Sequence, residues 1–184
     1  MANTESTFNN PAGAAAGHAE AYIRALLELL GDRDPWAVQE SLVDRLREAT
    51  AGLSEESLRR REAPGKWSVM EVIGHLADSE WVAGYRYRAT LAEDGPDLAG
   101  YDQDLWVRGL GSHRASLEPT LGRLRMLRQW NLELLRTLSA EDWQRIGHHS
   151  ERGEESVDQL FRLLAAHDLV HLRQIERIRK TLGE

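Results

Sequence analysis

The 184-residue chain contains no cysteine. This absence excludes disulfide bonds, thiolate metal sites and a catalytic thiol belonging to the protein itself. Any sulfur chemistry would therefore need a thiol supplied from outside the chain. The sequence also lacks a long uninterrupted apolar run, so we expect no membrane-spanning helix.

An excess of basic charge is missing as well. The chain has 23 lysines and arginines against 30 aspartates and glutamates, which gives a formal net charge of -7 at pH 7. Such a balance argues against a nucleic-acid partner, because phosphate recognition usually needs a basic surface. No basic segment followed by an apolar stretch opens the chain, which argues against a secretory signal. The sequence therefore predicts a cytoplasmic protein that binds neither nucleic acid nor membrane.

Strand signals are nearly absent, whereas helical periodicity covers most of the chain. We expect residues 1–17 to form a disordered tail and residues 18–184 to form a single domain. The apolar spacing predicts a short helix over residues 19–31 and four main helices over residues 35–51, 68–91, 113–138 and 156–182. A long link over 93–111 and a loop over 148–153 separate the later helices. The fold class is therefore all-α, a four-helix bundle with a short extra N-terminal helix.

Three helix starts carry capping signals. Asp34 precedes Pro35, a pair typical of an N-cap followed by proline in the first turn. Ser68 and Glu71 have the spacing of a capping box. Ser156 is placed to cap the last helix.

Two histidines interrupt the apolar seam of the last helix. The seam runs through Val157, Leu160 and Leu164 to Ile178 in steps of three and four, and the same stepping passes through His167, His171 and Gln174. A helix places residues i and i+4 on one face. Burying imidazoles there costs free energy unless something satisfies them. A bound metal ion is the most economical explanation, because neutral imidazole is a common ligand.

A third ligand is expected from another helix, and His75 is the best candidate. It lies on a largely apolar face with Val72 and Val82. Three histidines would leave the ion with open positions, the pattern of a catalytic site. The competing interpretation is that these are hydrogen-bonded core histidines. That interpretation is the better one for His75 alone, but the metal site is the better one for all three together.

Further polar residues are candidates for catalysis near such a site. Gln174 could contact substrate or a ligating imidazole, and Glu80 could serve as a base or pair with an arginine. Asp102 could cover the site from the long link. Arg86 and Tyr85 could hold a carboxylate, although an exposed ion pair explains them equally well.

The remaining candidates have simpler expected roles. We expect Trp67 to fill the core at its helix start and Asp168 to form a salt bridge. His148 and His149 should be exposed to solvent.

Two stretches that contain these histidines form recognisable signatures. PGKWSVMEVIGHLADSE (residues 64–80) and AAHDLVHLRQI (residues 165–175) strongly resemble the DinB-like superfamily, closest to its branch of metal-dependent hydrolases and thiol transferases. The resemblance covers nearly everything after residue 19. It implies an up-down-down-up four-helix bundle, a divalent metal bound by His75, His167 and His171, and a homodimer.

The resemblance leaves the reaction open. Imidazole ligands suit zinc, nickel, iron and copper, so the sequence does not name the ion, for which we expect zinc, nickel or iron. The predicted function is a metal-dependent enzyme on a small molecule, either transferring an external low-molecular-weight thiol or hydrolysing substrate through metal-bound hydroxide. The alternative is a non-catalytic metal-binding stress-response module, in which a fourth protein ligand, Gln174 or Glu80, would close the site.

Overall fold

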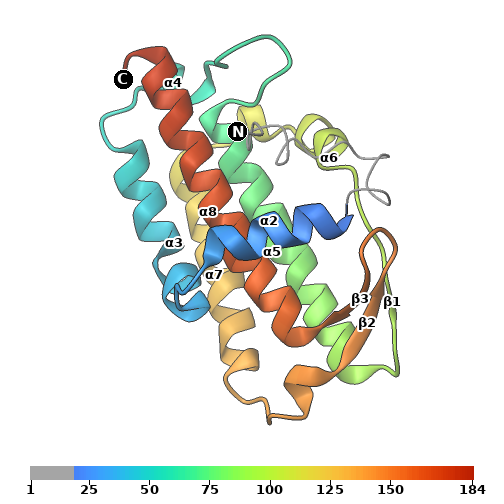
Figure 1. The fold of residues 1–184 in the computed structure, drawn as a ribbon. Coiled ribbons are helices and arrows are strands. Elements are labelled where there is room, and N and C mark those ends of the chain that lie inside the picture. The colour runs from blue at the N-terminus through green and yellow to red at the C-terminus, as the bar shows by residue number, and fades with distance from the viewer. Residues whose placement is uncertain (1–18) are drawn as a thin grey trace.

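The structure, a computed structural model, describes residues 19–184, so the predicted tail over residues 1–17 lies outside the described residues. Four long helices make up most of this part of the chain. They are α3 (Pro35–Thr50), α5 (Val69–Ala92), α7 (Leu117–Leu135) and α8 (Val157–Leu182). The chain runs up α3, down α5, down α7 and up α8 (Figure 1). The up-down-down-up bundle implied by the resemblance is confirmed.

The predicted helix starts agree with the structure. Asp34 accepts a hydrogen bond from the backbone N–H of Trp36, directly ahead of Pro35. Ser68 and Glu71 form both hydrogen bonds of a capping box at the start of α5. Ser156 accepts from the backbone N–H of Gln159 at the start of α8. These caps fix where the two histidine-bearing helices begin.

The third main helix is shorter than the predicted span of 113–138. A separate 3-10 turn, η2 (Ser112–Arg114), comes first, and extended backbone at Ser116 then leads into α7. Pro119 explains this start, because proline is tolerated only within the first turn of a helix. The prediction treated η2 and α7 as one continuous helix.

The nearly strand-free prediction was wrong in one region. A three-stranded sheet forms from β1 (Asp97–Leu98), β2 (Ile146–His149) and β3 (Gly153–Ser156). β1 pairs parallel to β2, which pairs antiparallel to β3. The predicted loop over 148–153 is thus largely a hairpin, and the predicted link over 93–111 contains β1 and α6 (Gln103–Gly109).

Close packing explains a glycine within the hairpin. A Cβ on Gly147 would lie 2.7 Å from Leu98 Cδ1 and 2.8 Å from Thr90 Oγ1. Only glycine therefore allows β2 to approach both β1 and α5 this closely. The hairpin is held against the lower end of the bundle, next to the link that joins α5 to α7 (Figure 1).

Two shorter helices complete the architecture. α2 (Ala19–Leu30) crosses the face of α8 and packs there through Leu26 and Leu30. It corresponds to the helix predicted over residues 19–31. α4 (Glu55–Arg59) lies between α3 and α5, and a short 3-10 turn, η3 (Asp142–Gln144), precedes β2. The main core lies between α3, α5, α7 and α8.

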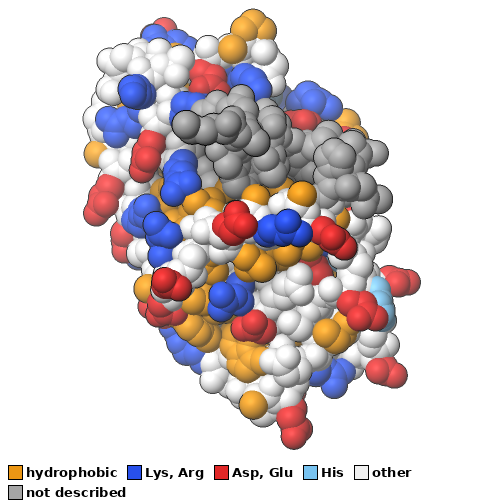
Figure 2. Space-filling model, in the orientation of Figure 1, with side chains coloured by type: hydrophobic (Ala, Val, Ile, Leu, Met, Phe, Trp, Pro, Cys, Tyr) orange, Lys and Arg blue, Asp and Glu red, His pale blue; other side chains and the backbone are white. Residues whose placement is uncertain are grey.

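The surface carries charges of both signs. Acidic and basic side chains are interspersed over the face that presents α2 (Figure 2). Among the described helices, none combines the length and the apolar character needed to cross a membrane.

Candidate metal centre

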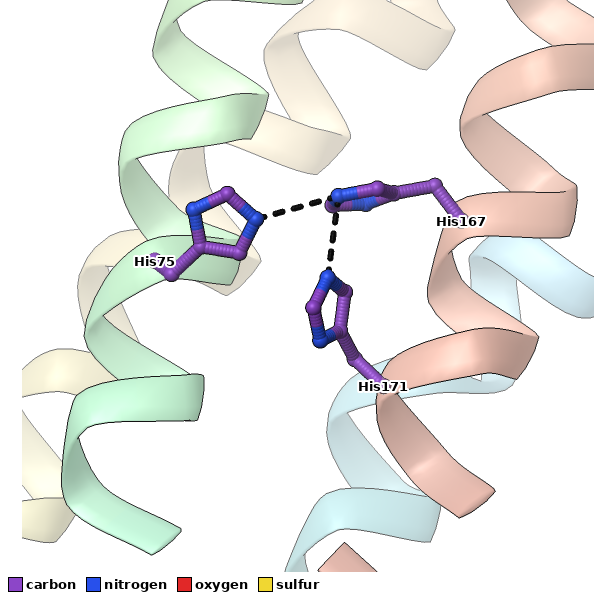
Figure 3. Close-up of side chains that lie close together, drawn as sticks. All are labelled: His75, His167 and His171. Atoms are coloured by element: carbon purple, nitrogen blue, oxygen red, sulfur yellow. Dashed lines mark hydrogen bonds between the residues drawn. The ribbon is translucent and has the colours of Figure 1, made fainter. Parts of the chain in front are cut away.

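α8 presents two histidines one turn apart toward α5. His167 and His171 lie on the same face of this helix, and their Nε2 atoms are 3.0 Å apart. His171 is buried and His167 is partly buried. Figure 3 shows both rings pointing into the space between α8 and α5.

α5 supplies the third histidine from the opposite side. His75 is buried, and its Nε2 lies 3.1 Å from Nε2 of His167 (Figure 3). One ligand atom from each of the three histidines falls within 4.8 Å of the others. The predicted convergence of these three residues is confirmed, since one helix brings two and its neighbour brings the third.

Hydrogen bonds alone do not satisfy this cluster. Nε2 of His167 faces both other Nε2 atoms, yet a ring nitrogen of a neutral histidine offers one proton or one lone pair. Nδ1 of His167 is also buried without a hydrogen-bond partner among the described residues.

A shared metal ion fits the spacing of the three rings. Two nitrogens each about 2.0–2.1 Å from one ion lie roughly 2.8–3.4 Å apart at ordinary coordination angles. The observed separations of 3.0 and 3.1 Å fall within that range. Three lone pairs directed at one ion would also remove the conflict at His167.

Burial keeps the three imidazoles neutral. It lowers the pKa of His75 and of His167 well below the ordinary value, and the neighbouring histidines act in the same direction. Burial lowers the pKa of His171 to about 4, against a smaller opposing effect of its hydrogen bond to Gln174. Because a metal ligand must be unprotonated, these shifts prepare all three rings to bind a cation near neutral pH.

Gln174 orients one of the three rings. Its Oε1 lies 2.7 Å from Nδ1 of His171, so this nitrogen carries the proton and Nε2 keeps its lone pair for the site. The predicted contact between Gln174 and His171 is present, while the role of His171 as a metal ligand stays a prediction. Its amide oxygen is therefore engaged by His171, and a direct catalytic role for Gln174 stays a prediction.

Trp67 forms a wall of the cluster. Its ring centroid lies 4.9 Å from that of His75, and its plane is nearly parallel to the ring of His171. The indole N–H donates to Asp104 on α6 at 2.9 Å. Trp67 packs against the core as expected, but it also ties the link between α5 and α7 to the histidines.

The sequence analysis missed a hydroxyl pair beside His75. Oγ of Ser79 lies 3.4 Å from Nε2 of His75 and 2.8 Å from the Tyr101 hydroxyl. Burial raises the pKa of Tyr101. The available signal was weak: Ser79 is one helical turn after His75, and Tyr101 belongs to a stretch of the link unusually rich in recognition-type side chains.

Glu80 and Asp102 lie outside the cluster. The Glu80 carboxylate is fully buried and accepts hydrogen bonds from Arg128 at 2.7 Å and Asn131 at 2.7 Å. Arg128 also pairs with Asp168 at 2.7 Å, as expected of that aspartate. Asp102 caps α6 by accepting from the backbone N–H of Leu105. No described aspartate or glutamate joins the three histidines.

The predicted exposure of His149 is wrong, although His148 is exposed. His149 points inward from β2 and is 3% exposed, because alternate residues of a strand face opposite sides. Burial lowers its pKa to about 3, and the charges of Arg152 and Arg86 add to this effect.

The depressed pKa of His149 predicts acid destabilisation. Between the unfolded-state pKa of about 6.5 and the folded value of about 3, the unfolded chain binds a proton that the folded chain excludes. The free energy of unfolding should therefore fall as pH drops through this window, by up to about 1.4 kcal/mol per pH unit for one such group. Urea unfolding of metal-free protein across this range should show a shallower fall for His149→Gln. The exposed matched control His148→Gln should behave like the parent, and equal slopes in all three would contradict the assignment.

The chain is similar to known proteins over most of its length. A family model described as the DinB superfamily matches residues 40–175. A Geobacillus thermodenitrificans protein named "Putative metal-dependent hydrolase" is 30% identical over 96% of this chain and 93% of its own. An Oceanobacillus iheyensis relative of the same description is 31% identical over 77% of this chain and 81% of its own.

A solved structure shares the fold. YfiT from Bacillus subtilis, described as "a probable metal-dependent hydrolase with an unusual four-helix bundle topology", aligns with a TM-score of 0.74. The alignment covers 96% of this chain and 94% of YfiT at 22% sequence identity. At that identity the likeness establishes the bundle topology, while the reaction has to be argued from the site.

Proposed function

The chain belongs to the DinB superfamily, and from this membership and the geometry of its histidines we propose that it is a metal-dependent enzyme acting on a small molecule. The proposal depends on three neutral imidazoles whose Nε2 atoms converge between α5 and α8. Three histidine ligands without a described carboxylate leave coordination positions for a substrate. Relatives named as metal-dependent hydrolases support the same conclusion.

The residues around the histidines have separate tasks in this proposal. His75, His167 and His171 hold the ion, which supplies acidification of a bound water or thiol near neutral pH. Gln174 holds the His171 ring in the tautomer that binds. The hydroxyls of Ser79 and Tyr101 are placed to exchange a hydrogen bond with a substrate atom beside His75.

We propose thiol transfer from an external low-molecular-weight thiol as the reaction, with hydrolysis as its close variant. A chain without cysteine cannot supply the sulfur nucleophile itself, so the thiol would bind as a second substrate. Either reaction uses the same site, and they differ only in whether a thiol or a water attacks the electrophilic carbon. Zinc, nickel and iron all suit three imidazole ligands.

Metal analysis followed by product analysis tests the function. Tag-free protein purified without a metal column should contain one equivalent of a divalent metal. The loaded protein is then incubated with p-nitrophenyl acetate, with and without glutathione. Mass spectrometry distinguishes the products, because attack by the thiol sulfur expels p-nitrophenolate and gives a thioester, whereas attack by water gives acetate.

Each result has a distinct meaning. Thioester formation that requires both metal and thiol would support transfer, and metal-dependent acetate alone would favour hydrolysis. Bound metal without turnover of any ester or electrophile in a broad panel would favour the non-catalytic stress-response module. Folded protein that takes up no metal would overturn the metal-dependent proposal.

We also propose that the protein is a homodimer, as the family resemblance implies. Large aromatic side chains are exposed on two neighbouring helices: Trp81 and Tyr85 on α5, and Trp130 on α7. The ring of Trp130 packs against the guanidinium of Arg88. A self-complementary contact would bury this surface in both copies. Sedimentation velocity should give a dimer for the parent and a monomer for Trp81→Ser/Trp130→Ser. A parent that stays monomeric at high concentration would contradict the proposal.

A further inference from the structure

A half-buried arginine without a described acidic partner lies further along α5. Arg86 donates through Nη2 to the Ala99 carbonyl at 2.8 Å. Its Nε is buried and has no hydrogen-bond partner among the described residues. No described carboxylate lies within ion-pair distance of Arg86, in contrast to Arg152, which makes two hydrogen bonds to Glu155.

A second unpartnered donor faces the same region from the hairpin. Nδ1 of His149 accepts a hydrogen bond from the backbone N–H of Glu151 at 3.1 Å. In the neutral ring the proton therefore resides on Nε2. That Nε2 is buried and has no partner in the described part of the chain. Leaving a buried N–H unpaired is costly, so each such group needs an explanation.

The two donors belong to one neighbourhood. Arg86 is bound to Ala99, the residue that follows Leu98, and Leu98 is paired with His149 across the two strands. The charges of Arg86 and Arg152 both act on His149. Burial is the main cause that lowers the pKa of Arg86 to about 10; the charge of Arg152 acts in the same direction, and Glu155 and Glu151 oppose it.

This neighbourhood continues the helix face that carries the candidate metal ligand. His75, Ser79 and Arg86 lie on one face of α5, because offsets of four and eleven residues both return close to the same direction. Eleven residues span roughly 16 Å of helix axis, and side chains tilt toward the helix N-terminus. The Cα–Cβ bond of Arg86 therefore tilts toward the end of α5 that carries His75. Tyr101 lies between them, since it contacts Ser79 and acts electrostatically on Arg86.

We propose that Arg86 Nε and His149 Nε2 bind a carboxylate of the small-molecule substrate, whose reacting end lies at the three histidines. A carboxylate has two oxygens, so one carboxylate can accept from both donors. This inference rests on the proposed function only in calling the ligand a substrate. The anion site itself does not require the metal. The substrate class is accordingly a small carboxylic acid.

Sodium acetate is the probe, and ¹⁵N NMR of the side chains is the readout. Acetate is titrated into the full-length zinc-loaded parent and into His75→Ala, which removes a metal ligand and with it acetate bound to the ion. In both proteins the Arg86 Nε–H and His149 Nε2–H signals should shift, with sodium chloride as the salt control. Arg86→Gln should weaken acetate binding about tenfold to a hundredfold. The matched control Arg88→Gln, on the α7 side of the same helix, should not.

The outcomes separate this inference from the metal proposal. Equal weakening by Arg86→Gln and Arg88→Gln would show diffuse electrostatics and overturn the site. A response seen only with zinc and independent of Arg86 would mean that acetate binds the ion, which also overturns it. A parent that binds no metal but retains the Arg86 response would keep the carboxylate site while the metal proposal failed. If Arg86→Gln does not fold, the response of the Arg86 signal in the parent still decides.

Discussion

Replacing His171 with alanine is expected to weaken metal binding by on the order of a thousandfold. Protein zinc sites have binding free energies of about 10–16 kcal/mol, so the loss of one of three ligands should remove ~4 kcal/mol. The change also breaks the pair of ligands one turn apart on α8, whose Nε2 atoms are 3.0 Å apart. Competition against a fluorescent zinc chelator measures the affinity of parent and variant directly.

Two companion variants make this prediction specific. His113→Ala removes an exposed histidine of η2 and should leave affinity unchanged. Gln174→Ala leaves all three ligands but frees the His171 ring, and should cost about 10–100-fold, as is usual for residues that orient a ligand. If His171→Ala bound zinc as tightly as the parent, the three-histidine site would be refuted.

The candidate site was predictable because its ligands interrupt a regular pattern. Helical periodicity assigns a direction to every residue of α8, so His167 and His171 stand out as polar residues on an apolar seam. The same reasoning placed His75 on an inward face of α5. Local sequence thus defined which histidines face the core, and packing of two adjacent helices brought them together.

The hairpin was not predictable from the same signals. β2 and β3 contain one β-branched aliphatic residue, Ile146, and are otherwise rich in histidine, glutamate and glycine. Their stability depends on β1, some fifty residues earlier in the chain, and on the close approach at Gly147. Strands so far apart in the sequence leave no local periodicity when they pair. Neither the hairpin nor the burial of His149 could therefore be predicted.

The burial of Arg128 was likewise not predictable from local sequence. In the sequence it is one of several arginines at helical spacing on α7, which ordinarily indicates a solvated face. In the structure it is buried between Glu80 of α5 and Asp168 of α8. These partners lie five residues after His75 and next to His167. The ion network therefore fixes the relative positions of the two helices that carry the histidines.

Replacing Arg128 with methionine is expected to lower the free energy of unfolding by about 3–5 kcal/mol. The variant leaves the carboxylates of Glu80 and Asp168 buried without their shared cation, and uncompensated buried charges carry a penalty of that size. Because small domains are stable by only about 5–15 kcal/mol, much of the stability would be lost. Urea unfolding of the metal-free proteins, followed by circular dichroism, measures the difference.

The chain offers a matched control on the same helix. Arg125 pairs with Asp44 at the surface, so Arg125→Met should cost no more than about 1 kcal/mol. Neutralising the network in the combined variant Arg128→Met, Glu80→Gln, Asp168→Asn should recover part of the loss, because no buried charge then lacks a partner. Equal effects of Arg128→Met and Arg125→Met would contradict the buried network. Loss of zinc affinity in Arg128→Met, with recovery in the combined variant, would show that this network holds α5 and α8 in the register that brings His75 to His167.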